Sequence, residues 1–336
     1  MLSILHFSFQ AVAPILILII VGFGARKAGL WDEHTLRKMN RVNFRLGLST
    51  LMYCNLYQID ADMPLPGREV VFVLVMLVLL TVIGFLAAHF LTPERTRKGV
   101  LAQCAFRSNY AIIGLVLAES IAGQAGVELG TIFQLPSVLY FNFMSVLALS
   151  IYSGGESTFS VKKTLGTIAK NPMIIGLLLG ALTILIRRQL PLNAAGEPVF
   201  LIKRDLPWAY NTVSMMSRIA TPNALLILGG QLDPGHAGAF KKELVSGVFM
   251  RLVMAPFLAF VGAFAAEKAG LITVTPALCA MMVAAFGSPL SVSTVAMAQE
   301  AKADEKLAGQ LVVWTSFLGM GTIFIMIAIL RAMGRV

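Results

Sequence analysis

Charged residues are scarce in this sequence. Only 13% of its 336 residues are Asp, Glu, Lys or Arg, whereas about a quarter of a typical soluble domain is charged. Hydrophobic residues make up 57%, the mean hydropathy is +0.79, and the apolar residues form runs long enough for the ~20-residue helix that crosses a bilayer. The sequence therefore predicts an all-α polytopic membrane protein, and no loop between the runs is long enough to fold as a soluble domain.

Carboxylates and histidines are missing from the middle of the apolar runs. The four histidines are scattered singly, and the acidic residues lie in loops or near the ends of the runs. A membrane enzyme would need paired carboxylates, a histidine–carboxylate set or a metal cluster. The three cysteines, Cys54, Cys104 and Cys279, lie within apolar runs without the spacing of metal ligands, which favours buried packing thiols. We therefore expect no enzyme, no cofactor and no metal.

Positive charge is in excess, with a net charge of +10 and a pI of about 9.7. The basic residues lie in short loops, which is typical of membrane orientation and contact with anionic lipid rather than of nucleic-acid binding. Most of them fall on the side that holds residues 26–38, 95–98, 162–170, 241–242 and 302–306. The positive-inside rule assigns that side to the cytoplasm and both termini to the outside, although the loop 187–205 opposes this orientation. The first ten residues lack a basic leader and a cleavage site, so we expect a first span rather than a signal peptide.

Ten spans are predicted from the apolar runs. They cover residues 7–25, 36–57, 70–90, 99–121, 129–152, 172–186, 206–229, 245–266, 276–300 and 307–330. The chain then divides into a first five-helix repeat, 1–152, a cytoplasmic connecting loop, 153–171, and a second repeat, 172–336. Because each half has an odd number of spans, the two halves must insert with opposite orientation, as in an inverted repeat.

The run 277–300 carries Gly287-Ser288-Pro289 in its middle. Proline removes an amide donor and clashes with the preceding turn, so we expect this helix to break at mid-membrane. Broken backbone is tolerated at that depth only where it is buried in protein or lines a wet cavity. Taken alone, a proline kink with packing serines would also explain the pattern.

A second run, 100–119, matches the first without gaps at a shift of 180 residues. The shift aligns Ser108 with Ser288 and Asn109 with Pro289. Two interrupted apolar segments at corresponding places in two halves point to the binding site of a transporter.

The polar groups near these two breaks are neutral or positive. Each break leaves a half-helix amino terminus with unpaired amides and partial positive charge. Arg107 could bond to freed carbonyls or contact a ligand, and Asn109 could cap the break, bind substrate or do both. Because no opposing acid is near, the pattern favours a small anionic substrate. Arg218 and Arg251 could add to this positive field or extend toward a membrane interface, and the second arrangement is expected for both.

The predicted substrate site consists of Arg107, Ser108, Asn109, Tyr110, Ser288, Pro289, Ser291, Ser293 and Thr294. Within it, Asn109, Ser288 and Pro289 are expected to shape the crossing of the broken helices. Arg107 and the hydroxyl groups of residues 291, 293 and 294 are the expected binding groups.

Several motifs along nearly the full length resemble the auxin efflux carrier family, the bacterial relatives of plant auxin transporters in a superfamily similar to the bile acid/sodium symporters. The motifs are Phe44-Arg45-Leu46-Gly47-Leu48-Ser49, Phe106-Arg107-Ser108-Asn109-Tyr110-Ala111-Ile112-Ile113-Gly114, Asn171-Pro172, Leu228-Gly229-Gly230, Ser288-Pro289-Leu290-Ser291-Val292-Ser293 and Leu307-Ala308-Gly309-Gln310. The chain departs from the family at Ser49 and Val116, where proline is frequent. The second departure makes the break in the fourth helix depend on Ser108-Asn109 and on packing.

The resemblance implies ten helices in two inverted five-helix repeats, with the fourth and ninth helices broken and crossing at the substrate site. It also implies a scaffold of spans 1, 2, 6 and 7 and a moving unit of spans 3–5 and 8–10. A homodimer and elevator-like alternating access would follow.

The function predicted from the sequence is secondary transport of a small organic anion across the bacterial cytoplasmic membrane. The substrate would be a dicarboxylate such as malonate or malate, or an auxin-like aromatic carboxylate. Export could be driven by the membrane potential alone, since one negative charge leaving at 100 mV gains ~2.3 kcal/mol. A sodium- or proton-coupled symporter is an alternative within the same class. A membrane-embedded ligand sensor is another, although the loop 153–171 is short for a signalling module.

Overall fold

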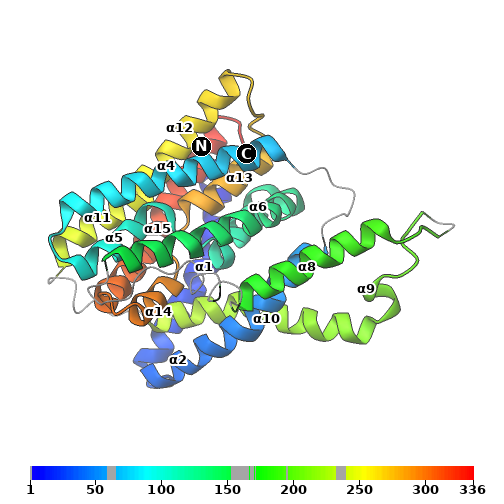
Figure 1. The fold of residues 1–336 in the computed structure, drawn as a ribbon, viewed down its shortest axis with the longest axis horizontal. Helices are drawn as coiled ribbons and strands as arrows, with labels where there is room; N and C mark the ends of the chain where they lie inside the picture. The colour runs from blue at the N-terminus through cyan, green and yellow to red at the C-terminus, as the bar shows by residue number, and fades with distance from the viewer. Residues whose placement is uncertain are drawn as a thin grey trace. The chain divides into compact units, whose positions relative to one another are not determined.

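Helices form almost all of the computed structural model, which describes residues 2–58, 66–152, 166, 170, 172–193, 196–231 and 240–336 (Figure 1). Within these ranges, backbone pairing of the β type is limited to two isolated antiparallel bridges, Ser108–Leu290 and Leu192–Pro198. The predicted all-α fold is confirmed. The predicted connecting loop, 153–171, falls almost entirely outside the described residues.

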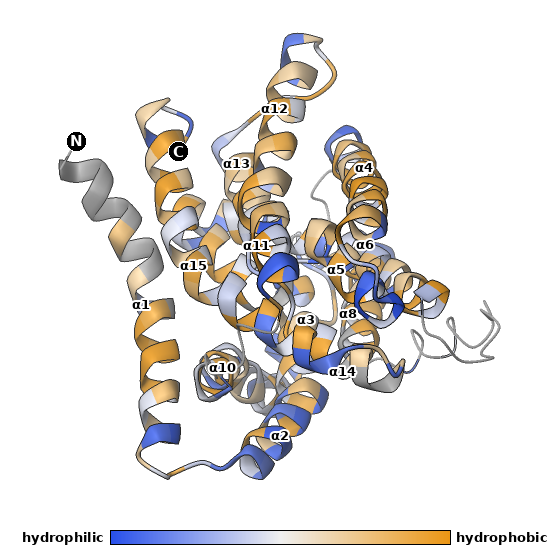
Figure 2. Cartoon of the chain, turned by 90° about the vertical axis from the view of Figure 1, so that its left-hand side faces the viewer, coloured by the Kyte–Doolittle hydropathy of each residue, from blue (hydrophilic) through white to orange (hydrophobic). Residues whose placement is uncertain are grey.

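Three helical segments of the described chain are long and apolar enough to cross a membrane: Gly67–Leu91, Lys241–Lys268 and Glu305–Ala332. The pair Leu115–Gln134 and Pro136–Tyr152, whose two parts are bent by 42°, meets the same criteria only if it is counted as one span. Figure 2 shows the continuous apolar character of the first of these, α4. The chain is therefore a multi-pass membrane protein.

Each span predicted from the sequence falls in a helical stretch of the structure. The helices are α1 (Leu2–Lys27), α2 (Glu33–Val42), η1 (Asn43–Gly47), α3 (Leu48–Tyr57), α4 (Gly67–Leu91), α5 (Arg95–Phe106), η2 (Tyr110–Gly114), α6 (Leu115–Tyr152), α8 (Pro172–Gln189), α9 (Ile202–Asp205), α10 (Pro207–Gly230), α11 (Lys241–Phe249), η4 (Met250–Met254), α12 (Ala255–Lys268), α13 (Pro276–Met282), η5 (Val283–Gly287), α14 (Ser293–Glu300) and α15 (Glu305–Ala332). The η elements are single π-helical turns. Ten crossings in two inverted halves stay a prediction.

The fourth and fifth predicted spans are joined in α6. Its helical dihedral angles are interrupted at Ala122 and Gly123, and Gly123 has a φ of 58°. Glycine adopts this left-handed conformation without the steric cost that other residues incur. The interruption lies between the predicted spans 99–121 and 129–152 and marks the boundary between them.

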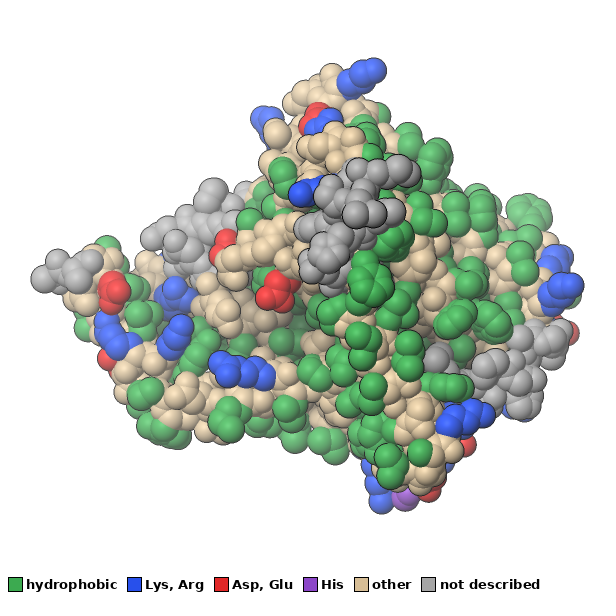
Figure 3. Space-filling view, turned by 180° about the vertical axis from the view of Figure 1, so that it is seen from behind, with side chains coloured by type: hydrophobic (Ala, Val, Ile, Leu, Met, Phe, Trp, Pro, Cys, Tyr) green, Lys and Arg blue, Asp and Glu red, His purple; other side chains and the backbone are tan. Residues whose placement is uncertain are grey.

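One face of α4 is exposed and apolar. Its exposed large side chains are Val71, Val75, Val78, Leu79, Val82, Leu86 and Phe90. They recur at helical spacing along one side, whereas Leu77, Leu80 and Ala88 are buried on the other. Hydrophobic side chains are also widely exposed on the face of the molecule drawn in Figure 3. Such a surface is typical of contact with lipid rather than water.

The chain forms two compact units that interleave along the sequence. Unit 1 comprises Met1–Ile17, Pro66–Ile168 and Gln231–Val336, and unit 2 comprises Leu18–Leu65 and Ala169–Gly230. The division into two sequential repeats, 1–152 and 172–336, stays a prediction. Apart from the first part of α1, unit 2 contains the predicted spans 1, 2, 6 and 7, and unit 1 contains the predicted spans 3–5 and 8–10.

Unit 2 is held together by close helix packing, with α3 against both α8 and α10. A Cβ atom added at Gly22 would lie 2.0 Å from Leu226 O, and one at Gly229 would lie 1.9 Å from Ile19 O. Small residues of this kind let the backbones of α1 and α10 approach closely, as in other membrane helix pairs. Arg26 Nη1 also donates to a terminal carbonyl of α10, Gly230 O, at 2.8 Å.

Unit 1 has a polar cluster at the amino-terminal ends of α5, α11 and α15. Arg97 Nη1 lies 3.1 Å from Glu243 Oε1, and Arg97 Nε lies 3.1 Å from Asp304 Oδ2. Thr92 Oγ1 donates to Glu243 Oε1 at 3.0 Å, and Asp304 Oδ1 accepts from Leu307 N at the start of α15. These interactions link the starts of α5, α11 and α15 to one another.

Candidate functional site

Both helices that were predicted to break do so at the predicted positions, and both breaks lie in unit 1. α5 ends at Phe106, and helical structure resumes at η2 with Tyr110. The second helix ends with η5 at Gly287 and resumes as α14 at Ser293. The first break occurs without proline, so the valine at position 116 does not prevent it.

The two interrupted segments pair with each other through their backbones. Asn109 N donates to Pro289 O at 2.7 Å, and Ser108 and Leu290 form an antiparallel bridge. Leu290 N in turn donates to Thr315 Oγ1 of α15 at 3.1 Å. Backbone groups that leave a helix inside a membrane must find partners within the protein. At this crossing, Asn109 N finds its partner in the other segment and Leu290 N finds its partner in α15.

Arg107 is 3% exposed and lies in the first break itself. Its Nη1 donates to Phe141 O at 3.1 Å and to Ser145 Oγ at 2.6 Å, both on α6. Its Nη2 donates to Ser293 Oγ, at the start of α14, at 2.7 Å. Among the residues that the structure describes it forms no ion pair, and its Nε has no partner. Burying a charge in this way costs roughly 3 kcal/mol even on the most favourable membrane scale. Because arginine stays protonated in proteins, Arg107 places a positive charge at the break.

Four polar atoms at the crossing are buried without a hydrogen-bond partner among the described residues. They are Ser108 Oγ, Asn109 Nδ2, Ser288 Oγ and Thr294 Oγ1. Leaving such a group unpaired costs ~1–3 kcal/mol, and in native proteins most are satisfied by water, ions or ligands. Together with Arg107 Nε, these atoms leave the crossing with a group of unsatisfied buried polar atoms among the described residues.

The other predicted site residues have internal partners. Tyr110 is fully buried, and its hydroxyl group donates to Gly130 O of α6 at 2.6 Å. Ser291 Oγ and Ser293 Oγ lie 2.8 Å apart and are half-buried. Pro289 contributes its carbonyl to the crossing. The structure thus brings the predicted residues together, with Tyr110 held by α6.

Sequence reasoning missed a row of buried polar residues on α6. Gln134, Ser137 and Ser145 are all fully buried, and neither the Gln134 amide nor the Ser137 hydroxyl has a partner among the described residues. With Phe141 they recur every three or four positions, so they share one face of the helix. That spacing within an otherwise apolar run was the signal that could have revealed them.

Arg251 corrects a prediction, because it does not extend to an interface. It is 0% exposed and donates through Nη2 to Phe286 O in η5. Arg251 lies ten residues beyond Lys241, the first residue of its helix, which is about 15 Å along the axis. An arginine side chain cannot span that distance, so it bonds within the protein instead. Arg218 is exposed on α10.

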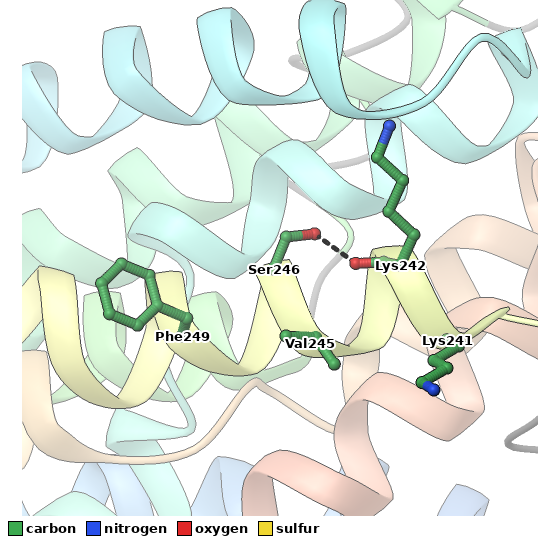
Figure 4. Close-up of a pocket in the computed structure, with 5 residues that line it drawn as sticks. All are labelled: Lys241, Lys242, Val245, Ser246 and Phe249. Atoms are coloured by element: carbon green, nitrogen blue, oxygen red, sulfur yellow. Dashed lines mark hydrogen bonds between the residues drawn. The ribbon is translucent and has the colours of Figure 1, made fainter.

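A shallow groove on α11 lies apart from these residues. It has a volume of about 620 Å³ and is lined by Lys241, Lys242, Val245, Ser246 and Phe249. Figure 4 shows these side chains along one helix, with Ser246 Oγ donating to Lys242 O at 2.8 Å. None of the predicted site residues lines the groove, which combines two lysines with apolar side chains.

Comparison with known proteins identifies the family of the chain. A family profile described as "Membrane transport protein" matches residues 7–327, nearly the whole chain. No curated protein matches the sequence. The family is auxin efflux carrier-like and is one of transporters rather than enzymes, which confirms the resemblance and the expectation that the chain is not an enzyme. The chain therefore belongs to the membrane transport protein family and is a membrane transporter.

Proposed function

We propose that this transporter carries a small organic anion, either a dicarboxylate such as malonate or malate or an auxin-like aromatic carboxylate. The proposed binding site is the crossing of the two broken helices. The observation that carries the proposal is the set of buried, unpartnered polar atoms beside a buried arginine that forms no ion pair among the described residues.

The chemistry of these atoms suits a carboxylate. Arg107 Nε and Asn109 Nδ2 are donors, and the hydroxyl groups of Ser108, Ser288 and Thr294 can donate as well. A carboxylate only accepts hydrogen bonds, so it could satisfy several of these donors at once. The amino terminus of α14 adds partial positive charge at the same place. A cationic substrate would find few free acceptors here and an unneutralised guanidinium.

Alternating access by an elevator-like movement fits the division into two units. Every residue of the proposed site belongs to unit 1. If unit 1 moves as a body, the bound anion would travel with it, while unit 2 would serve as the scaffold of a homodimer. The two units are drawn from both halves of the chain, as expected for interleaved repeats.

The transporter would lie in the bacterial cytoplasmic membrane, with both of its termini outside the cell.

The groove on α11 would contact an anionic phospholipid. Its headgroup would meet Lys241 and Lys242, and an acyl chain would lie on Val245 and Phe249, which are 66% and 56% exposed. Lysines beside an apolar helix face are typical of such contacts.

The proposal is tested by screening carboxylates for thermal stabilisation of the purified protein and then measuring their flux in proteoliposomes. We expect at least one carboxylate to stabilise the parent and to move with net charge. Asn109→Ala should weaken its apparent affinity at least about tenfold, which corresponds to 1.4 kcal/mol. The matched control is Asn142→Ala, because Asn142 Nδ2 bonds only its own helix, at Val138 O.

Other outcomes separate the alternatives. If Asn109→Ala responds to the ligand as the parent does, the site assignment is wrong. Flux that requires a sodium or proton gradient would indicate a symporter. Binding without flux under any gradient would indicate a ligand sensor.

A further inference from the structure

Arg251 is the largest side chain that is completely buried in the described part of the chain. It projects from the π-helical turn η4, in the interior of the long helix Lys241–Lys268. π-Helical turns inside α-helices occur frequently at functional sites. The family resemblance and the predicted anion site do not account for this residue.

No carboxylate in the described part of the chain balances the charge of Arg251. It forms no ion pair within the described ranges, and Nε and Nη1 have no hydrogen-bond partner there. Its hydrogen-bond partner is a backbone carbonyl, Phe286 O. Packing alone does not explain why a guanidinium occupies this position, since a buried charge without an opposite charge costs free energy unless a specific interaction offsets that cost.

Phe286 is the penultimate residue of η5, directly before the second break. Its carbonyl therefore belongs to the carboxyl-terminal end of a half-helix, where unpaired carbonyls carry partial negative charge. In carriers with broken helices, such half-helix ends and unwound carbonyls coordinate the coupling cation. In this chain the guanidinium of Arg251 is bonded at that end.

We propose that Arg251 is a tethered cation that takes the place of a diffusible coupling cation at the carboxyl-terminal end of the η5 half-helix. The inference rests on the proposed carrier function, because a coupling site has meaning only in a carrier. It deepens that function by assigning sodium-independent operation to a particular side chain. Arg251 is a positioning residue: it holds the second break in shape from outside, while Arg107 lies within the first break and faces the anion.

The experiment compares the melting temperatures of four purified proteins in the absence of any carboxylate: the parent, Arg251→Lys, Arg251→Met and Arg251→Ala. Arg218→Ala, which removes an exposed arginine, serves as the control. Each protein is measured in choline chloride and after addition of sodium or of low, non-denaturing guanidinium at constant ionic strength.

We expect the parent, Arg251→Lys and the Arg218→Ala control to melt at the same temperature with and without sodium. Arg251→Met should melt lower than Arg251→Lys by roughly 3–6 °C, because its side chain has a similar length without charge. Arg251→Ala should also melt lower, and guanidinium or sodium should restore part of the loss in a saturable manner. Rescue by a small cation is a response that a packing role would not produce.

Three results would overturn the inference: saturable stabilisation of the parent by sodium, equal melting of the Lys and Met variants, or loss of stability in Arg251→Ala that no small cation restores. If Arg251→Ala does not fold, the Lys–Met comparison and the parent's response to sodium still decide the matter. Because no substrate is used, these results are independent of whether the carried molecule is an organic anion.

Discussion

The two helices are each interrupted in the middle, but by different residues. The second break has proline at position 289, whereas the first has Ser108 and Asn109 and no proline. The backbone nevertheless leaves the helical conformation at both breaks, and the two segments pair through the hydrogen bond from Asn109 N to Pro289 O. The comparison indicates that backbone pairing between the segments maintains the breaks and that proline is one of several ways to begin one.

The breaks also differ in where their positive charge comes from. Arg107 is part of the first break and bonds to α6 and α14. The second break has no arginine of its own and receives a guanidinium from Arg251, on η4. The charge inside the first break is placed beside unpartnered groups that can meet a ligand, whereas the charge at the second is bonded at a helix end. The two buried arginines are therefore expected to have different functions.

The largest effect is expected from Arg107→Met. This change removes three hydrogen bonds and the positive charge beside the proposed anion site. Bonds from a charged group contribute ~1.5–3 kcal/mol each, so transport should fall by well over about tenfold. The measurement is the initial rate of carboxylate flux in proteoliposomes at equal amounts of inserted protein. Arg107→Lys should be intermediate, since one ammonium group cannot reproduce the spread of the guanidinium donors.

Transport by Arg107→Met at the parental rate would contradict the distinction between the two arginines. If transport persisted without Arg107 but was lost without Arg251, then Arg251 rather than Arg107 would be the arginine that the transported anion requires.

A smaller effect is expected from Thr315→Val, which tests whether the crossing needs its anchor on α15. Valine keeps the shape but removes the acceptor of Leu290 N, leaving a buried donor unpaired. The free energy of unfolding should fall by ~1–3 kcal/mol. The control is Ser316→Ala, the next residue, whose buried hydroxyl has no partner among the described residues. Denaturant unfolding that shows equal losses for both variants would argue against the anchor.

The smallest effect is expected from Pro289→Ala. The bond to Asn109 N uses the carbonyl of residue 289, which alanine retains. The cost should be limited to the greater flexibility of the unfolded chain, below ~1 kcal/mol. Binding of the transported carboxylate, measured by calorimetry, should change by less than about threefold, or ~0.7 kcal/mol. Loss of binding as complete as in Arg107→Met would mean that proline, and not pairing, maintains the second break.

Much of the fold could be predicted from the sequence because the bilayer imposes strong patterns. Apolar runs of spanning length gave the helices, and the glycine–serine–proline interruption located the second break. Its counterpart at Ser108-Asn109 was found through internal similarity, although it contains no residue that prevents helix formation. The division into units was not visible in composition, since it depends on which helices pack together, and here it was implied by the family resemblance alone.

The site was predicted less completely than the fold. Residues in the two breaks were found because they interrupt a pattern. Gln134 and Ser137 were missed because they lie within a regular helix. Only the side of the helix to which their side chains project reveals that they are buried and have no partner among the described residues. Arg251 was assigned to an interface because a charge within a span usually reaches water. Its position in the interior of a long helix makes that impossible.

The central claim is that the two broken helices pair at residues 108 and 290, and cysteine cross-linking tests it most directly. Ser108→Cys and Leu290→Cys would be combined in a chain whose Cys54, Cys104 and Cys279 are replaced by alanine. Residues opposite each other in an antiparallel pair have Cα atoms ~4.5–5.5 Å apart, within the range of a disulfide. The account predicts a cross-link in native membranes under mild oxidation, detected by mass after cleavage of the chain between the two sites, and no cross-link for Ser120→Cys with Leu290→Cys. Cross-linking of the 108–290 pair no greater than that of the control pair would contradict it.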